Sequence, residues 1–141
     1  MSGFRLVALL AVLGLGVVLG GCGQSASEKA NLAAARSVVE RFAAGTDARA
    51  CHLLTNNAVQ ALYGKFTATA AQSRRNCARR SVRFRGETVK ITRSELLDPM
   101  TIKINALDQD GKFSYQVNLR KGRGGRWRID LISQAKVTST F

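Results

Sequence analysis

The spacing of apolar residues changes once along the chain, close to Ser81. Before that point, apolar side chains recur every three or four residues, as in amphipathic helices, and after it they alternate with polar side chains, as in half-buried strands. The pattern therefore predicts helices first and strands afterwards. This order indicates an α+β fold in which the N-terminal helices pack on one face of an antiparallel sheet.

Four helices are expected in the first half of the chain. The first begins with Ser27 as its N-cap and ends at Gly45, a typical C-terminal glycine. Its apolar face consists of Leu32, Ala35, Val38, Val39 and Phe42. A short second helix is expected over residues 48–54, because Asp47 can cap it.

A third helix is expected after Asn56 or Asn57, either of which can serve as its N-cap. One side of it is apolar, with Val59, Leu62 and Phe66. A fourth helix is expected from about Thr69 to Arg80, which places the two cysteines beyond Cys22 on two different helices.

Alternating stretches then predict the strands of the sheet. Their apolar positions are Val89 and Ile91; Ile102, Ile104 and Ala106; Phe113, Tyr115, Val117 and Leu119; and Trp127, Ile129 and Leu131. Turn-forming residues at 108–111 and 121–125 separate the last three stretches. Short turns between strands favour an antiparallel sheet with one apolar face, against which the helices pack.

The first 22 residues follow neither pattern. One positive charge, Arg5, precedes 14 residues, Leu6 to Leu19, that have no charged or polar side chain. A short basic start, an apolar stretch of about 7–15 residues and small residues at the cleavage point characterise a secretory signal. The apolar run is short for a membrane-spanning helix, which needs about 20 such residues.

The apolar run closes with Leu19-Gly20-Gly21-Cys22, which resembles the lipobox of bacterial lipoprotein signal peptides. The resemblance implies that residues 1–21 are removed and that Cys22 carries a diacylglyceryl group. Residues 22–29 are then the lipidated cysteine and a short tether, and residues 30–141 form a single domain. We expect a lipid-anchored protein on the extracytoplasmic face of the cell membrane. A plain signal peptide or an uncleaved anchor is the alternative.

Net charge narrows the expected partners. The chain carries +13, and removal of residues 1–21 takes away Arg5 alone, which leaves 21 Lys and Arg against 9 Asp and Glu, or +12. Such an excess attracts anionic lipid head groups and wall polymers. Nucleic acid is not expected as a partner of an exported protein. The alternative is a merely solvated, soluble surface.

Arginine is concentrated in one segment, which makes that segment a candidate anion-binding patch. The six residues are Arg74, Arg75, Arg79, Arg80, Arg83 and Arg85. A second basic cluster surrounds the last turn, with Lys121, Arg123, Arg126 and Arg128. Arginine binds phosphate bidentately. A solvated face is the alternative for both clusters.

The cysteines beyond Cys22 are Cys51 and Cys77. An even remainder in an exported chain favours a disulfide, and closing a loop of about 25 residues stabilises a fold by about 3 kcal/mol. Two free thiols or a metal pair are the alternatives. Zinc is not expected, because His52 is the single histidine and no CxxC spacing occurs. No cofactor is expected.

Three segments together resemble a known family. They are Phe42-Ala-Ala-Gly-Thr-Asp47, Ala50-Cys-His-Leu-Leu-Thr55 and Gly125-Arg-Trp-Arg-Ile-Asp130. This looks like the small actinobacterial lipoproteins of the nuclear transport factor 2-like superfamily, over roughly residues 30–132. The resemblance implies a cone-shaped α+β fold, in which the helices pack on a curved antiparallel sheet. It does not imply an activity, because the superfamily includes isomerases, dehydratases and non-catalytic binding modules.

Enzymes of that superfamily work inside the cone with an Asp or His base and Tyr hydrogen bonds. The residues here that could serve are His52, Tyr63, Tyr115 and Asp130. No Ser–His–Asp order, phosphate-binding glycine loop or clear carboxylate pair accompanies them. Tyr63, Tyr115 and Trp127 are candidate pocket residues, although apolar strand positions more often belong to the core.

The leading hypothesis is a non-catalytic domain that binds a small apolar ligand or an envelope protein through its cone. The alternatives are a small isomerase or dehydratase that uses the cone pocket, and a cationic protein that binds anionic lipid or wall polymer. A deep pocket beside a buried acid would favour the enzyme, whereas a packed cone would favour the binding domain.

Overall fold

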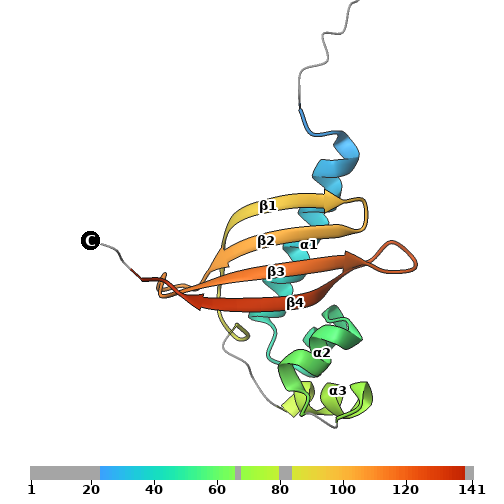
Figure 1. Cartoon of the computed structure of the whole chain (residues 1–141), viewed down its shortest axis with the longest axis vertical. Helices are drawn as coiled ribbons and strands as arrows, with labels where there is room; N and C mark the ends of the chain where they lie inside the picture. Colours follow the sequence, from blue (N-terminus) through green and yellow to red (C-terminus); the bar gives the residue numbers. More distant parts are fainter. Residues whose placement is uncertain (1–22, 66–67, 80–83, 139–141) are drawn as a thin grey trace, which may run out of the picture.

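The computed structural model describes residues 23–65, 68–79 and 84–138. Their helices are α1 (Ala26–Ala44), the 3-10 helix η1 (Ala48–Leu53), α2 (Asn56–Tyr63) and α3 (Ala70–Arg79). Their strands are β1 (Lys90–Asp98), β2 (Thr101–Leu107), β3 (Phe113–Lys121) and β4 (Trp127–Lys136). The predicted order of helices before strands is confirmed (Figure 1).

The four strands form one antiparallel sheet in the order β1-β2-β3-β4. Alternation along β2 and β3 produces one apolar face, because cross-strand partners lie on the same side of a sheet. Three such pairs are buried: Ile102 with Leu119, Ile104 with Val117, and Ala106 with Tyr115. The alternation read from the sequence therefore identifies the core face of the sheet correctly.

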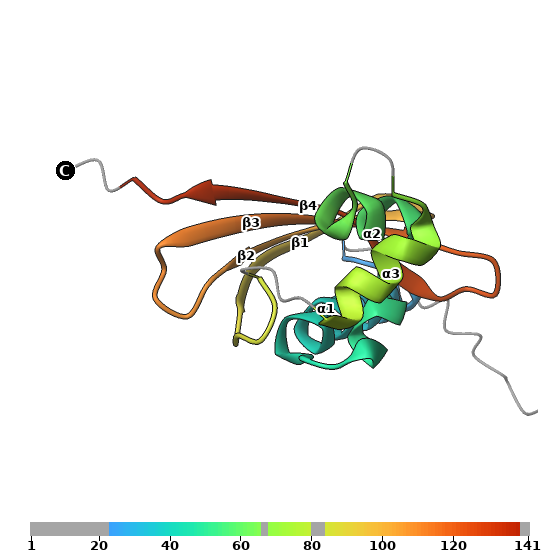
Figure 2. The same ribbon diagram turned by 90° about the horizontal axis from the view of Figure 1, so that it is seen from below.

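Helix α1 crosses the apolar face of the sheet, whereas α2 and α3 lie beyond its β4 edge (Figures 1 and 2). Phe42 of α1 is fully buried and stacks on Phe84, which in turn meets the ring of Tyr115 edge-on at 4.6 Å. Each large side chain buried in this way contributes about 1.5–3 kcal/mol. The concave side of the sheet is thus filled by side chains rather than left open.

Two helix starts differ from the sequence prediction. Ser25, not Ser27, caps α1, and its Oγ accepts a hydrogen bond from the Glu28 N–H at 3.1 Å. The ordered helix therefore begins at Ala26, inside the segment expected to be a tether. Thr55, rather than either asparagine, caps α2, because its N–H is also bonded to the Ile129 carbonyl at 2.8 Å. A contact with β4 thus decides where α2 begins.

Gly45 ends α1 as predicted, but for a different physical reason. Its φ is −79°, so the left-handed conformation typical of a C-terminal glycine is not used. A Cβ at this position would lie 2.6 Å from the Cβ of Ala50 and 2.9 Å from the Arg41 carbonyl oxygen. Close packing of α1 against η1 is what requires glycine.

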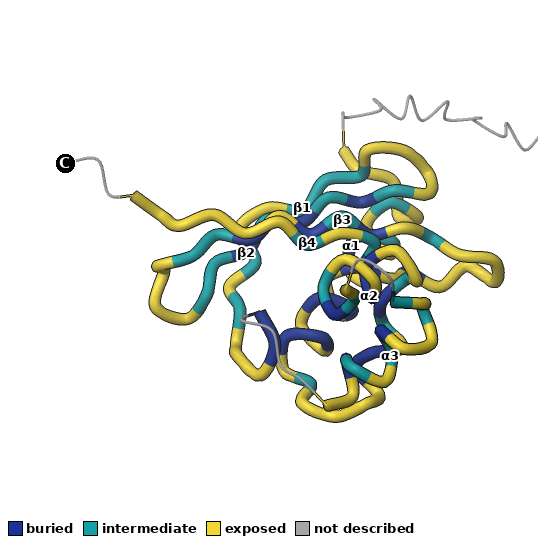
Figure 3. Tube along the Cα trace, turned by 60° about the horizontal axis from the view of Figure 1, so that its bottom comes forward, coloured by how far each residue is buried: buried dark blue, intermediate teal, exposed yellow. Residues whose placement is uncertain are grey.

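Strand β1 is longer than its alternating stretch indicates. Val89 precedes the strand and Ile91 lies at its start, but the strand continues to Asp98 with a bulge between Ile91 and Arg93. A bulge and an edge position both weaken the alternation of buried and exposed residues. In Figure 3, exposed residues occupy the turns and the end of β4, and buried residues gather where the sheet meets the helices.

Candidate functional site

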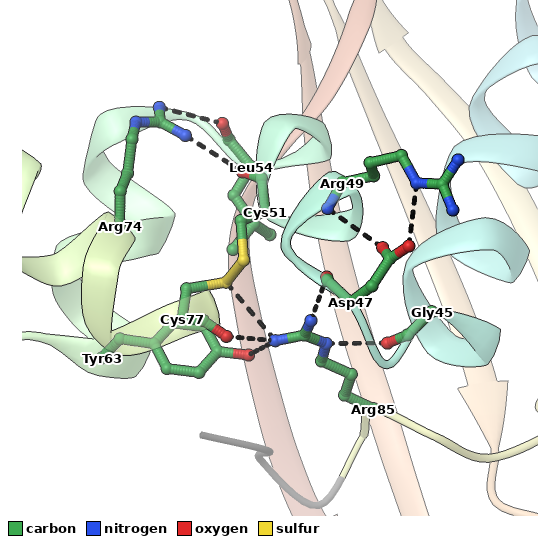
Figure 4. Close-up of a disulfide and its surroundings, with 9 residues drawn as sticks. All are labelled: Gly45, Asp47, Arg49, Cys51, Leu54, Tyr63, Arg74, Cys77 and Arg85. Carbon is green, nitrogen blue, oxygen red and sulfur yellow. Dashed lines mark hydrogen bonds and ion pairs between the residues drawn. A yellow bond between two sulfur atoms is a disulfide. The ribbon is translucent and has the colours of Figure 1, made fainter. Parts of the chain in front are cut away.

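A disulfide ties the helical layer together. Cys51 of η1 and Cys77 of α3 are bonded, with their Cα atoms 6.0 Å apart, which confirms the predicted pair (Figure 4). The bond closes a loop of 26 residues. It therefore holds η1, a helix of only six residues, in a fixed position against α3.

The proposal that Arg85 belongs to a surface anion-binding patch is wrong. Its side chain is buried, with 4% of the residue exposed. Its guanidinium donates hydrogen bonds to the carbonyl oxygens of Gly45, Asp47 and Cys77 (Figure 4). It also donates to the hydroxyl of Tyr63 at 3.4 Å. Arg85 joins the end of α1 to α2 and α3, so it is a structural residue.

Arg74 has a similar role at the other end of the disulfide. It is half-buried, and it donates to the Cys51 carbonyl at 3.0 Å and to the Asn56 side-chain oxygen at 2.8 Å. A third, longer hydrogen bond reaches the Leu54 carbonyl. These contacts fix the end of η1 and the start of α2, and they occupy the guanidinium.

The predicted arginine patch is therefore reduced to its exposed members. Arg75 and Arg79 are exposed one turn apart on α3. Arg80 and Arg83 lie outside the described residues, as do Phe66, Cys22 and residues 1–21. The described part of the segment presents two neighbouring cations rather than a continuous arginine surface.

The three candidate pocket residues lie in different places. Tyr63 is buried beside Arg85, and Tyr115 packs in the core against Phe84. Trp127 lies at the start of β4, where its Nε1–H donates to Asn31 of α1 at 3.4 Å. They do not form one pocket, because the space enclosed by the sheet is occupied by the core.

Trp127 instead borders an open groove of about 740 Å³ between α1, η1 and the start of β4. Its lining residues are Ala34, Ser37, Val38, Arg41, His52, Leu53, Gly125, Arg126, Trp127 and Arg128. Leu53 is partly exposed and supplies apolar surface, to which Val38 and Trp127, 4% and 5% exposed, add little. The lining includes three arginines and the single histidine of the chain, and no Asp or Glu. We call this feature the basic groove.

The cations of the basic groove are available for a ligand. Arg126, Arg128 and His52 are exposed, and their side chains form no ion pair or hydrogen bond with any residue that the structure describes. Arg41 makes one hydrogen bond, from Nε to the Ser37 carbonyl at 3.3 Å. Its terminal nitrogens are thus left for other acceptors. Together these groups give the groove a positive potential.

Trp127 is held firmly on its side of the groove. Lys121 donates from Nζ to the same Asn31 oxygen, at 3.1 Å, and its ammonium lies 5.5 Å from the centre of the indole ring. A cation at that distance from a tryptophan face is attracted by the ring. The apolar side of the groove is therefore preorganised by contacts with α1 and β3.

Some of the residues that line the basic groove can be identified from the sequence. In the sequence, Arg126 and Arg128 belong to a basic cluster, and His52 is the single histidine. Arg41 was missed, although it follows Ala34 and Val38 at helical spacing and so shares their face. These residues come together in one groove because η1 packs between α1 and β4. No local sequence pattern specifies that packing.

The described residues provide little for acid–base catalysis. All nine Asp and Glu residues are described, and none is buried. The pKa of Asp47 is lowered by a hydrogen bond from Arg49, that of Glu95 by one from Lys103, and that of Asp98 by the Met100 N–H. Asp130 accepts from Thr55 Oγ1 at 2.7 Å. These carboxylates are held by partners at the surface.

Among the residues described, no group of three or more His, Cys, Asp or Glu gathers to hold a metal ion. The described helices also include none that is long and apolar enough to cross a membrane.

Comparison with known proteins bears on the fold. No model of a known protein family matches the chain, and no curated protein sequence matches it. A solved structure does: an NTF-2-like protein of unknown function from Silicibacter pomeroyi, with a TM-score of 0.50 and 13% sequence identity. The match covers 81% of this chain and 100% of that one. The protein therefore has an α+β, NTF-2-like fold, with helices packed on a four-stranded antiparallel sheet.

Proposed function

We propose that this protein is a lipid-anchored, extracytoplasmic and non-catalytic domain that binds an anionic ligand in the basic groove. The observation that carries the proposal is the composition of that groove. Its lining joins three arginines and a histidine to apolar surface, without a carboxylate. A volume of about 740 Å³ lies within the range of small-molecule sites, roughly 300–1,000 Å³.

The ligand class follows from the groups that line the groove. Guanidinium groups recognise phosphate and carboxylate oxygens bidentately. Leu53, which is partly exposed in the lining, favours a small apolar portion next to the anion. We therefore propose an oxyanion that carries a small apolar group, such as a phosphate ester or a carboxylate of an envelope lipid or wall polymer.

The non-catalytic part of the proposal rests on the filled interior. A general base needs a positioned partner within hydrogen-bonding distance. His52 is exposed, and Asp130 bonds to Thr55 outside the sheet's concave side. An isomerase or dehydratase that works inside the cone is therefore less well supported than a binding domain.

The location rests on the N-terminal pattern. The apolar run that closes at Leu19-Gly20-Gly21-Cys22 supports a bacterial lipoprotein, and the three segments that resemble small actinobacterial lipoproteins support that type. Acyl chains add about 0.8 kcal/mol of membrane affinity per buried CH₂, so a diacylated Cys22 would retain the domain at the membrane. There the groove would meet phosphate-bearing material at high local concentration.

Isothermal titration calorimetry with phenyl phosphate tests the binding proposal, with benzyl alcohol as the neutral control ligand. Phenyl phosphate should bind and benzyl alcohol should not. Added salt should lower the affinity for phenyl phosphate, because it screens the charges. Arg41→Gln or Arg126→Gln should reduce affinity about tenfold or more, because each removes a charge-assisted hydrogen bond, which contributes about 1.5–3 kcal/mol. Arg75→Gln, the same change at an exposed site on α3, is the matched control. Equal affinity of all three variants would place the phosphate elsewhere.

A further inference from the structure

We infer that one end of the sheet is a second membrane contact, which lays the domain on an anionic bilayer in a fixed orientation. This end consists of the β1–β2 turn, residues 97–100, and the β3–β4 turn with its flanks, residues 120–126 (Figure 1). We call it the turn end. The inference rests on the lipid anchor of the proposed function, but the turn end and the anchor can be tested separately.

Apolar side chains at the turn end are exposed. Leu97 is 51% exposed and Met100 is 48% exposed, and they flank Asp98 and Pro99. The Asp98 side chain accepts a hydrogen bond from the Met100 N–H at 2.7 Å, which fixes the turn. Two large apolar side chains on one rigid turn are suited to the boundary between head groups and acyl chains.

Cations lie on the turn next to these apolar side chains. The neighbouring turn carries Arg120, Lys121, Arg123 and Arg126. The Lys121 N–H is bonded to the Met100 carbonyl at 2.8 Å, so the two turns form one surface. Asp98 is the single acidic residue among residues 97–100 and 120–126. The excess of positive charge matches an anionic bilayer, where each nearby Lys or Arg raises affinity about fivefold.

The anchor reaches the membrane beside this surface. Lys121 and Trp127 both donate to Asn31, which is five residues after the first residue of α1, Ala26. At about 1.5 Å per helical residue and at most about 3.5 Å per extended residue, Cys22 lies within roughly 22 Å of Asn31. A lipid on Cys22 therefore holds the turn end close to the bilayer.

The opposite end of the sheet lacks this combination. The β2–β3 turn holds Asp108 and Asp110, and Lys112 is paired with Asp110 at 3.4 Å. The charge of this turn is nearly balanced, so an anionic bilayer attracts the turn end more strongly than the β2–β3 turn. The inferred orientation places the β2–β3 turn away from the membrane.

Met100 is a native reporter of this contact. The chain has two methionines, and Met1 belongs to the segment expected to be cleaved. Hydrogen peroxide transfers one oxygen atom to the thioether, giving methionine sulfoxide and water, at a rate that depends on exposure of the sulfur. Burial of Met100 in a bilayer should therefore slow its oxidation, which peptide mass spectrometry measures.

The experiment uses the full chain as extracted from the membrane, reconstituted in vesicles of phosphatidylglycerol with phosphatidylcholine or of phosphatidylcholine alone. We expect Met100 to be oxidised at least about fivefold more slowly on the anionic vesicles than in detergent. Arg120→Gln with Arg123→Gln should restore most of the rate, since each charge accounts for about fivefold in binding. The matched control is Arg75→Gln with Arg79→Gln, which removes the same charge from α3 and should leave protection unchanged.

Equal oxidation rates in detergent and on both vesicles would overturn the inference. Protection in detergent that grows with protein concentration would also overturn it, because the turn end would then contact a second copy of the chain. Intact mass of the same sample reports the acyl groups independently. Protection of Met100 without acyl mass would refute the lipid anchor but support the membrane contact of the turn end. Acyl mass without protection would support the anchor but refute that contact.

Discussion

At the scale of single residues, the same side chain serves different purposes according to what surrounds it. Arg85 and Arg126 both belong to basic clusters in the sequence, yet one is buried under carbonyl oxygens and the other is exposed in a groove. The amino-acid composition of the two clusters does not distinguish the buried arginine from the exposed one. The distinction arises because Arg85 lies where the Gly45, Asp47 and Cys77 carbonyls converge.

The structural role of Arg85 leads to a prediction about stability. Arg85→Gln should lower the free energy of unfolding by about 3 kcal/mol, because several buried carbonyl groups lose their donors at about 1–3 kcal/mol each. Arg79→Gln, at an exposed position on α3, should change it by less than about 0.5 kcal/mol. Urea denaturation followed by circular dichroism measures both. A similar small effect for the two variants would show that Arg85 is not a structural residue.

At the scale of elements, the basic groove depends on η1. This helix of six residues is too short to be stable alone. The Cys51–Cys77 bond holds it from one side, and Arg74 donates a hydrogen bond to its Cys51 carbonyl. The alternation and helical spacing in the sequence predicted the elements themselves, because burial of one face is a local pattern. They did not predict the caps Ser25 and Thr55 or the length of β1, which depend on local competition between hydrogen bonds and on an edge position.

The disulfide should therefore affect both stability and ligand binding. Cys51→Ala with Cys77→Ala should lower the free energy of unfolding by about 3 kcal/mol, the value expected for a loop of this size. Affinity for phenyl phosphate should also fall, because His52 and Leu53 lose their fixed position.

Non-reducing peptide mapping of the unmodified protein should recover the two cysteines in one linked peptide pair. Alkylation of both thiols in the folded protein would contradict the bond.

At the scale of the whole molecule, the NTF-2-like fold is used without an open interior. Sequence resemblance indicated the fold, and Trp127 and His52 were noticed as isolated residues. The groove that joins them lies outside the sheet's concave side, between α1, η1 and β4. Its position depends on contacts between residues about 75 to 96 positions apart in the chain, such as those of Thr55 with Asp130 and of Asn31 with Trp127. Short-range spacing carries no information on such contacts.

The anchor fixes the location of the protein, and location decides which anions the groove and the turn end encounter. Intact-mass analysis of the membrane-extracted protein tests it directly. The prediction is a chain that begins at Cys22 and carries acyl mass, together with release of the Cys22→Ala variant into the soluble fraction. A chain that begins at Met1 and carries no added lipid would contradict it.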